Sequence, residues 1–254
     1  MRSEDYPWLQ ALTTPQLRVG NVRRLAQEGD VTPAMADRAV KVITKEIAGD
    51  GPRTREELRD ALRRANLPTA GQALIHLVFR AALDGLIVRG PMRGKQHCYA
   101  LVADWLPKPP RMSRAKALAE LGRRYLAAHA PADERDLARW AGITLGDARR
   151  ALADARPPRR TAAEPPPVKL LGPFDELLMG WDDRSLVLPR TLSAQVISGG
   201  IFRSTVLVRG RVAGTWSLDR GRVQTAVSGR VSARALRAEI ADVERFLAPA
   251  GRAA

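Results

Sequence analysis

The sequence has little of what disulfide-bonded, metal-binding or membrane proteins require. It contains one cysteine, Cys98, so no disulfide can form within the chain and no cysteine cluster can hold a metal. Its three histidines are scattered, without the spacing of metal ligands. The longest apolar region, residues 73–88, is interrupted by His76, Arg80 and Asp84. We therefore expect no metal, no cofactor and no membrane contact, and a cytoplasmic location.

Acidic residues are scarce relative to basic ones. The chain has 42 Lys and Arg against 27 Asp and Glu, a formal net charge of +15. Such an excess is typical of proteins whose partner is a polyanion, most often nucleic acid. Hydrophobic residues make up 45% of the 254 residues, which predicts a globular protein with two or three small domains.

Residues 54–101 contain the pattern on which the rest of the interpretation depends. Thr54 is followed three residues later by Glu57, a capping box that predicts the start of a helix. Apolar residues at helical spacing continue this helix to Ala65, and the Leu67-Pro68 pair ends it.

The segment that follows predicts a second helix and a hairpin. The helix is expected from about Thr69 to Leu83. Residues 86–101 consist of two short apolar runs on either side of a basic turn with Gly and Pro, which predicts a β-hairpin. A further helix is expected to begin at Thr32, with Pro at its first turn. Helix, turn, helix and hairpin in this order predict a winged helix over residues 30–104.

The second helix and the hairpin carry side chains that suit nucleic acid. At 100° per residue, four hydrogen-bonding side chains of the helix fall opposite its apolar stripe. A solvated face is the alternative for the helix alone, but the hairpin places cationic side chains beside the same face. The candidate DNA-binding residues are Thr69, Gln72, His76, Arg80, Arg89, Arg93, Lys95 and His97.

Changes in composition divide the rest of the chain. Residues 1–29 are interpreted as the remainder of a preceding helical or winged-helix domain, because large apolar residues occur with no earlier element to pack on. Residues 105–112 form a Pro-rich linker. Three helical segments over residues 113–156 have helix-turn-helix spacing, with the wing reduced or lost. Residues 157–167 form a second Pro-rich linker.

The final segment, residues 168–254, changes to a β pattern. The pairs Arg209-Gly210 and Arg220-Gly221 stand between β-rich runs, which predicts hairpin turns. Apolar residues at helical spacing from Ser232 to Leu247 predict a closing amphipathic helix. This part is therefore expected to be a small antiparallel β domain with a C-terminal helix.

Candidate catalytic groups are few. Asp175 and Glu176 are adjacent acids, best explained as a helix cap with a solvated neighbour or as partners of arginines such as Arg184. No Ser/His/Asp set and no phosphate-binding Gly loop appears.

Six short segments, taken in order, carry a family resemblance. They are Asp5–Leu9, Gly51–Leu58, Gly71–Leu77, Ala81–Leu86, Leu171–Leu178 and Thr205–Trp216. Their order resembles that of the winged-helix DNA-binding proteins of the AlkZ/YcaQ-type crosslink-repair DNA glycosylase family. The resemblance implies an α+β protein in which tandem winged-helix units are followed by a small antiparallel β-barrel-like domain with a C-terminal helix, and it implies a DNA duplex as the partner.

The resemblance also implies a catalytic motif and a chemistry. Members with known activity remove bulky alkylated purines and unhook interstrand crosslinks, with a Gln (or His)-x-Gln (or Asp) motif in the first winged helix that positions the attacking water. This sequence contains no such motif, and the family's first winged helix would lie upstream of Met1. No catalytic residue is therefore carried over, and we expect a chain that lacks most of the first winged-helix domain.

The resulting expectation is a monomeric, nucleoid-associated protein that binds double-stranded DNA and is non-catalytic or truncated as it stands. Two alternatives stay open. One is an active DNA glycosylase that excises alkylated purines or unhooks crosslinks with a different catalytic residue. The other is a winged-helix transcription regulator, which would bind two half-sites as a dimer.

Overall fold

The protein is represented by a computed structural model that describes residues 2–29, 31–107, 112–157 and 163–248. The chain divides into two compact units, each described here by itself. Unit 1 comprises residues 1–124 and 141–155, and unit 2 comprises residues 125–140 and 156–254. The two linkers predicted at 105–112 and 157–167 lie partly outside the described residues.

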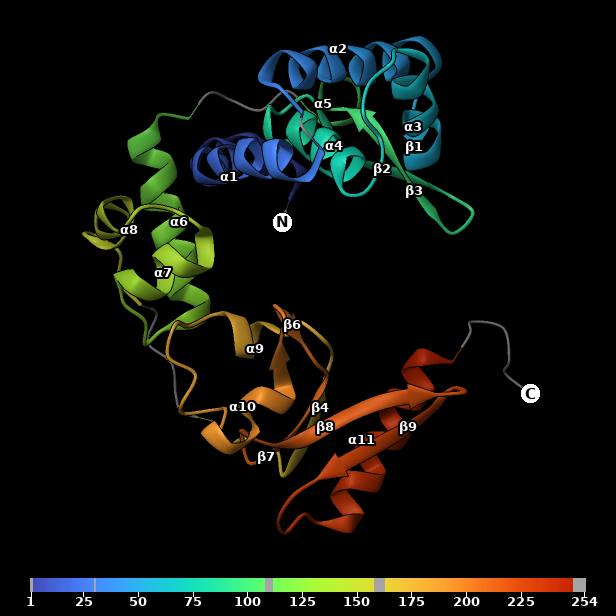
Figure 1. Cartoon of the computed structure of the whole chain (residues 1–254). Coiled ribbons are helices and arrows are strands. Elements are labelled where there is room, and N and C mark those ends of the chain that lie inside the picture. The colour runs from blue at the N-terminus through green and yellow to red at the C-terminus, as the bar shows by residue number, and fades with distance from the viewer. Residues whose placement is uncertain (1, 30, 108–111, 158–162, 249–254) are drawn as a thin grey trace. The chain divides into compact units, whose positions relative to one another are not determined.

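Unit 1 packs helices against a small antiparallel sheet (Figure 1). Its first helices are α1 (Tyr6–Gly29), α2 (Pro33–Asp50), α3 (Arg55–Arg64) and α4 (Ala73–Leu83). The sheet contains β1 (Arg53–Thr54), β2 (Ile87–Arg93) and β3 (Gln96–Leu101) in the order β1-β3-β2, and α5 (Val102–Trp105) follows. Apolar residues of α2, α3, α4 and β2 form one core, which includes Ile43, Leu58, Leu77 and Ile87.

Local signals explain where these helices begin. The Thr32 hydroxyl accepts a hydrogen bond from the Met35 N–H and caps α2. Thr54 and Glu57 form the predicted capping box of α3. The second helix of the pattern begins at Ala73 rather than at Thr69, because Gly71 takes a left-handed conformation (φ 52°) that interrupts the helical backbone. The hairpin is confirmed as β2 and β3.

Three further helices match the helix-turn-helix spacing expected after the first linker. They are α6 (Arg114–His129), α7 (Glu134–Ala141) and α8 (Leu145–Leu152). Gly142, at φ 64°, forms the turn before α8, and the Thr144 hydroxyl caps that helix by accepting from the Asp147 N–H.

Unit 2 contains the antiparallel strands and the closing helix. Its elements are β4 (Val168–Leu171), α9 (Glu176–Met179), α10 (Arg190–Val196), β5 (Ile197–Ser198), β6 (Ile201–Phe202), β7 (Thr205–Val208), β8 (Arg211–Asp219), β9 (Arg222–Val227) and α11 (Ala233–Leu247). Four strands form one sheet in the order β4-β7-β8-β9, and β5 pairs with β6.

The two X-Gly turns have the geometry that the sequence predicts. Arg209 and Gly210 have φ angles of 48° and 78°, and Arg220 and Gly221 have 47° and 80°. Positive φ at both central residues defines a type I′ turn, whose twist matches that of antiparallel strands. These turns therefore fix the pairing of β7 with β8 and of β8 with β9.

The sheet of this unit differs from the barrel-like, closed sheet that the sequence resemblance implies. The hydrogen-bonded sheet ends at β4 and β9, so the described strands form an open sheet. Four strands are fewer than a closed barrel uses. Instead, α11 covers one face of the four-stranded sheet. Leu236, Ile240 and Val243 of α11 pack against the buried residues Val206 and Val223 of the sheet.

Candidate nucleic-acid interface

The outward face of α4 differs from the one that helical spacing predicts. Gln72, Ile75 and Phe79 are exposed, whereas His76 and Arg80 are half-buried. His76 lies beside α1, since its backbone carbonyl accepts a hydrogen bond from the Asn21 side chain at 3.0 Å. The α1 helix therefore covers part of the polar face that the sequence assigns to DNA.

Arg80 is held by two carboxylates. Its Nη2 lies 3.2 Å from Oδ1 of Asp37 on α2, and its Nε lies 3.0 Å from Oδ2 of Asp84. The Arg80 side chain is only 16% exposed. Its charge is thus largely neutralised within unit 1.

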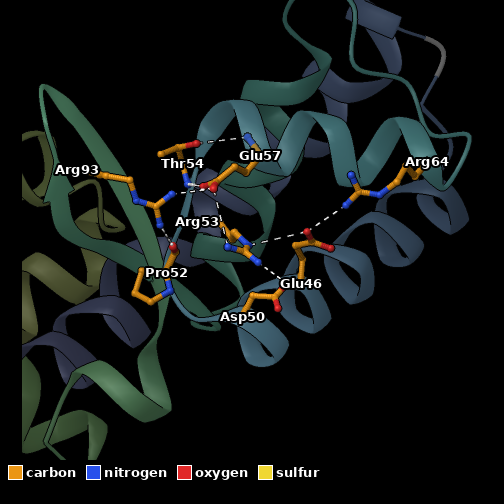
Figure 2. Close-up of polar contacts among 8 residues, drawn as sticks. All are labelled: Glu46, Asp50, Pro52, Arg53, Thr54, Glu57, Arg64 and Arg93. Atoms are coloured by element: carbon orange, nitrogen blue, oxygen red, sulfur yellow. Dashed lines mark hydrogen bonds and ion pairs between the residues drawn. The ribbon is translucent and has the colours of Figure 1, made fainter.

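Arg93, on the hairpin, is also paired (Figure 2). Its Nη1 donates to Oε1 of Glu57 at 2.7 Å, and its Nη2 donates to the Pro52 carbonyl at 2.9 Å. Thr69 has a polar partner as well, since its hydroxyl accepts from Arg63 Nε at 3.3 Å.

Glu57 joins the start of α3 to the hairpin. Its Oε2 accepts a hydrogen bond from the Thr54 N–H at 2.7 Å, while its Oε1 accepts one from the Arg93 guanidinium. The Thr54 backbone hydrogen bond, followed by the Arg93 guanidinium, holds the pKa of the Glu57 carboxyl below its ordinary value, although partial burial opposes this. Figure 2 shows a neighbouring set of contacts in which Arg53 meets Asp50 and Glu46, and Arg64 also reaches Glu46. Each cation of this set therefore has an acidic partner within unit 1.

The remaining cations of the candidate set lie around a recess between α3 and the hairpin. This recess has a volume of about 270 Å³ and is lined by Arg55, Glu56, Arg89, Lys95, Gln96, His97 and Tyr99. Within the described part of the chain, no acid forms an ion pair with Arg55, Arg89 or Lys95. Glu56, the acid at the rim, pairs with Arg59. The recess is therefore positively charged.

A second, more apolar recess adjoins the first at Arg55, Arg89 and Tyr99. It has a volume of about 380 Å³, and its other lining residues are Ile75, Val78, Phe79, Ala82 and Val88. The two recesses together present an apolar floor with arginines along its edge.

Arg55 is the functional candidate that sequence reasoning missed. It follows the Thr54 cap, and short β1 pairs with β3 so that Arg53 faces Tyr99 and Thr54 faces Cys98. This pairing joins residues more than 40 positions apart, so no local pattern indicates that Arg55 lies beside Arg89.

Unit 2 holds a polar cluster around the adjacent acids. Asp175 caps α9 by accepting from the Leu177 N–H at 2.9 Å, as the sequence suggests. Glu176 is more than a solvated neighbour, because its Oε1 lies 2.9 Å from Nε2 of buried His129 and accepts from Trp140 Nε1. Arg184 donates to the Leu178 carbonyl rather than to either acid.

Among the residues that the structure describes, no group of three or more His, Cys, Asp or Glu side chains could hold a metal ion. In the same residues, no helix combines the length and apolarity needed to cross a bilayer.

The chain combines a mainly helical unit that contains a cationic recess with a separate antiparallel β unit, as expected of a nucleic-acid-binding protein of mixed α and β structure. A family model described as DNA glycosylase AlkZ-like matches residues 1–248, and the chain therefore belongs to the AlkZ-like DNA glycosylase family.

Among solved structures, the Streptomyces sahachiroi DNA glycosylase AlkZ is similar, with a TM-score of 0.68 and 20% sequence identity. The match covers 96% of this chain and 75% of the AlkZ chain. At this identity the likeness shows a shared fold alone. No curated protein matches the sequence.

Proposed function

We propose that this protein binds double-stranded DNA through unit 1. In this proposal residues 30–104 form a winged helix, α4 enters the major groove, and the β2–β3 hairpin follows the phosphate backbone. The observation that carries the proposal is the recess in which exposed Arg55, Arg89 and Lys95 have no acidic partner among the described residues. Membership of a DNA glycosylase family supports DNA as the polyanion.

The proposed contacts differ in kind. Arg55, Arg89, Lys95 and His97 contact phosphates, which position the protein without carrying sequence information. Gln72, exposed at the start of α4, lies where a recognition helix contacts base edges, and Thr69 precedes it. We further propose that the protein acts as a monomer and that residues 168–254 form the β domain of unit 2, whereas the three helices of residues 113–156 are divided between the two units.

The salt dependence of binding tests the proposal. The three cationic contacts, Arg55, Arg89 and Lys95, give a slope of about −2.7 in log K against log salt, and a loss of about 40-fold in affinity between 50 and 200 mM. The measurement is fluorescence anisotropy of a labelled duplex at several salt concentrations. An affinity that does not change with salt would contradict phosphate binding.

A matched pair of lysines localises the interface. Lys95 lines the recess, whereas Lys45 is exposed on α2 and does not line it. Both substitutions, Lys95→Ala and Lys45→Ala, remove one positive charge from unit 1. We expect Lys95→Ala to reduce the slope by about 0.9 and Lys45→Ala to leave it unchanged. Equal effects would show that net charge, and not this surface, drives binding.

A second candidate function is excision of alkylated purines, which family membership favours. It predicts release of free N7-alkylguanine from alkylated duplex DNA when the protein is in molar excess. Absence of release at saturating protein, with binding intact, would leave DNA binding as the function of this chain.

A further inference from the structure

The exposed face of α4 is apolar where a phosphate-binding helix would be polar. Ile75 is 44% exposed and Phe79 is 40% exposed, and both line the apolar recess. They lie on the same side of the helix as exposed Gln72, at i+3 and i+7. Together with the recess that they line, these two side chains give α4 an exposed apolar surface next to a basic one.

The charges around this surface indicate the chemistry of its partner. Arg55 and Arg89 stand at the edge of the recess, and Lys95 and His97 continue the basic character along the hairpin. A partner that fits has anionic edges with apolar groups between them. The major groove of DNA has this arrangement, because phosphate rows flank base edges and thymine presents its C5 methyl group there.

The spacing of the two apolar side chains is comparable to the spacing of base pairs along DNA. Ile75 and Phe79 are four residues apart, which corresponds to about 6 Å along the helix axis. Consecutive base pairs are separated by about 3.4 Å, so the two side chains span about two base steps.

We propose that α4 favours DNA that carries thymine methyl groups about two base pairs apart, with Ile75 and Phe79 in contact with those methyl groups. Gln72 is placed to form a bidentate hydrogen bond with an adenine nearby. This inference rests on the proposed function, because it requires α4 to lie in the major groove.

Replacement of thymine by uracil tests the inference directly, since it removes the C5 methyl group and keeps base pairing. Two duplexes of otherwise identical sequence are compared. One contains thymine, and the other contains uracil in place of every thymine. We expect wild-type protein to bind the thymine duplex more tightly by about fourfold for each buried methyl group, or about 16-fold for two. Equilibrium anisotropy at fixed low salt measures the ratio.

Variants assign the preference to α4. The double substitution Ile75→Ser and Phe79→Ser should reduce the thymine-to-uracil ratio to about one while keeping the salt slope, because the phosphate contacts remain. Val19→Ser is the control, since Val19 is 54% exposed on α1 and does not line the recess. It should leave the ratio unchanged. Thermal unfolding of each variant establishes that these exposed substitutions preserve the fold.

The outcomes separate the two proposals. Equal affinity of wild-type protein for both duplexes, with a normal salt slope, would overturn the inference and leave DNA binding intact. The same result would follow if the apolar face serves another protein. A ratio that persists in the double variant would also overturn it, because the methyl contact would lie elsewhere. No binding to either duplex would overturn the proposed function as well.

Discussion

Gly180 provides a prediction in which two effects oppose each other. It follows α9 with φ −69° and ψ −20°, a conformation open to any residue, so backbone entropy alone predicts that Gly180→Ala stabilises the protein by about 0.4–1 kcal/mol. A Cβ at this position, however, would lie 2.5 Å from Cδ2 and 2.9 Å from Nε2 of the His129 ring. Contacts this short cannot persist, so either the ring or the backbone must move.

The surroundings of His129 make that movement costly. The residue is 5% exposed, and its ring stacks on Tyr125 with centroids 4.5 Å apart and meets the edge of Trp181 at 5.1 Å. Overpacking of this kind costs about 1–3 kcal/mol, and displacement of the ring from Glu176 costs about 1 kcal/mol more. Sterics therefore outweigh entropy, and we expect Gly180→Ala to lower the free energy of unfolding by about 1–3.5 kcal/mol.

Urea unfolding followed by tryptophan fluorescence measures the change, since Trp140 and Trp181 lie in the same cluster. Gly172→Ala is the control: Gly172 lies in the same unit as Gly180, its added Cβ would meet nothing within 4 Å, and the variant should be no less stable than wild type. In a His129→Ala background the cost of Gly180→Ala should disappear, because the ring is gone. A Gly180→Ala protein as stable as wild type would refute the reasoning.

Two further predictions concern charges. Hydrogen bonds from Arg123 and then Arg124 lower the pKa of Glu120 to about 2, below its unfolded value near 4.5. Its contribution to stability is therefore present above about pH 4.5 and lost as the pH falls toward 2, so Glu120→Gln should flatten the dependence of unfolding free energy on pH in that window. Arg80→Ala should destabilise unit 1 by breaking the contacts to Asp37 and Asp84 while keeping the salt slope of DNA binding, and Arg89→Ala should do the reverse. Similar salt slopes for these two arginine variants would contradict the assignment of Arg89 to phosphate.

Local features of the fold could be predicted because their causes are local. The hydroxyl caps at Thr32, Thr54 and Ser232 each satisfy an N–H three residues away, so a short stretch of sequence contains both partners. The sequence places the start of α4 too early, at Thr69, because a single glycine within a helical pattern does not by itself end a helix. The left-handed backbone of Gly71 shows that the helix begins after it.

Sequence alone determined α2, α3 and α11, the hairpins around residues 94, 210 and 221, and the excess of positive charge, since these follow from spacing and composition. Tertiary structure decided which cations are free. Arg80 and Arg93 meet acids 43 and 36 residues away, whereas the pairing of β1 with β3 brings Arg55 and Arg89 to the lining of one recess. Periodicity gives the direction of a side chain relative to its own helix. It carries no information about which distant residue lies there, and that residue decides whether the charge of an arginine is neutralised within the fold.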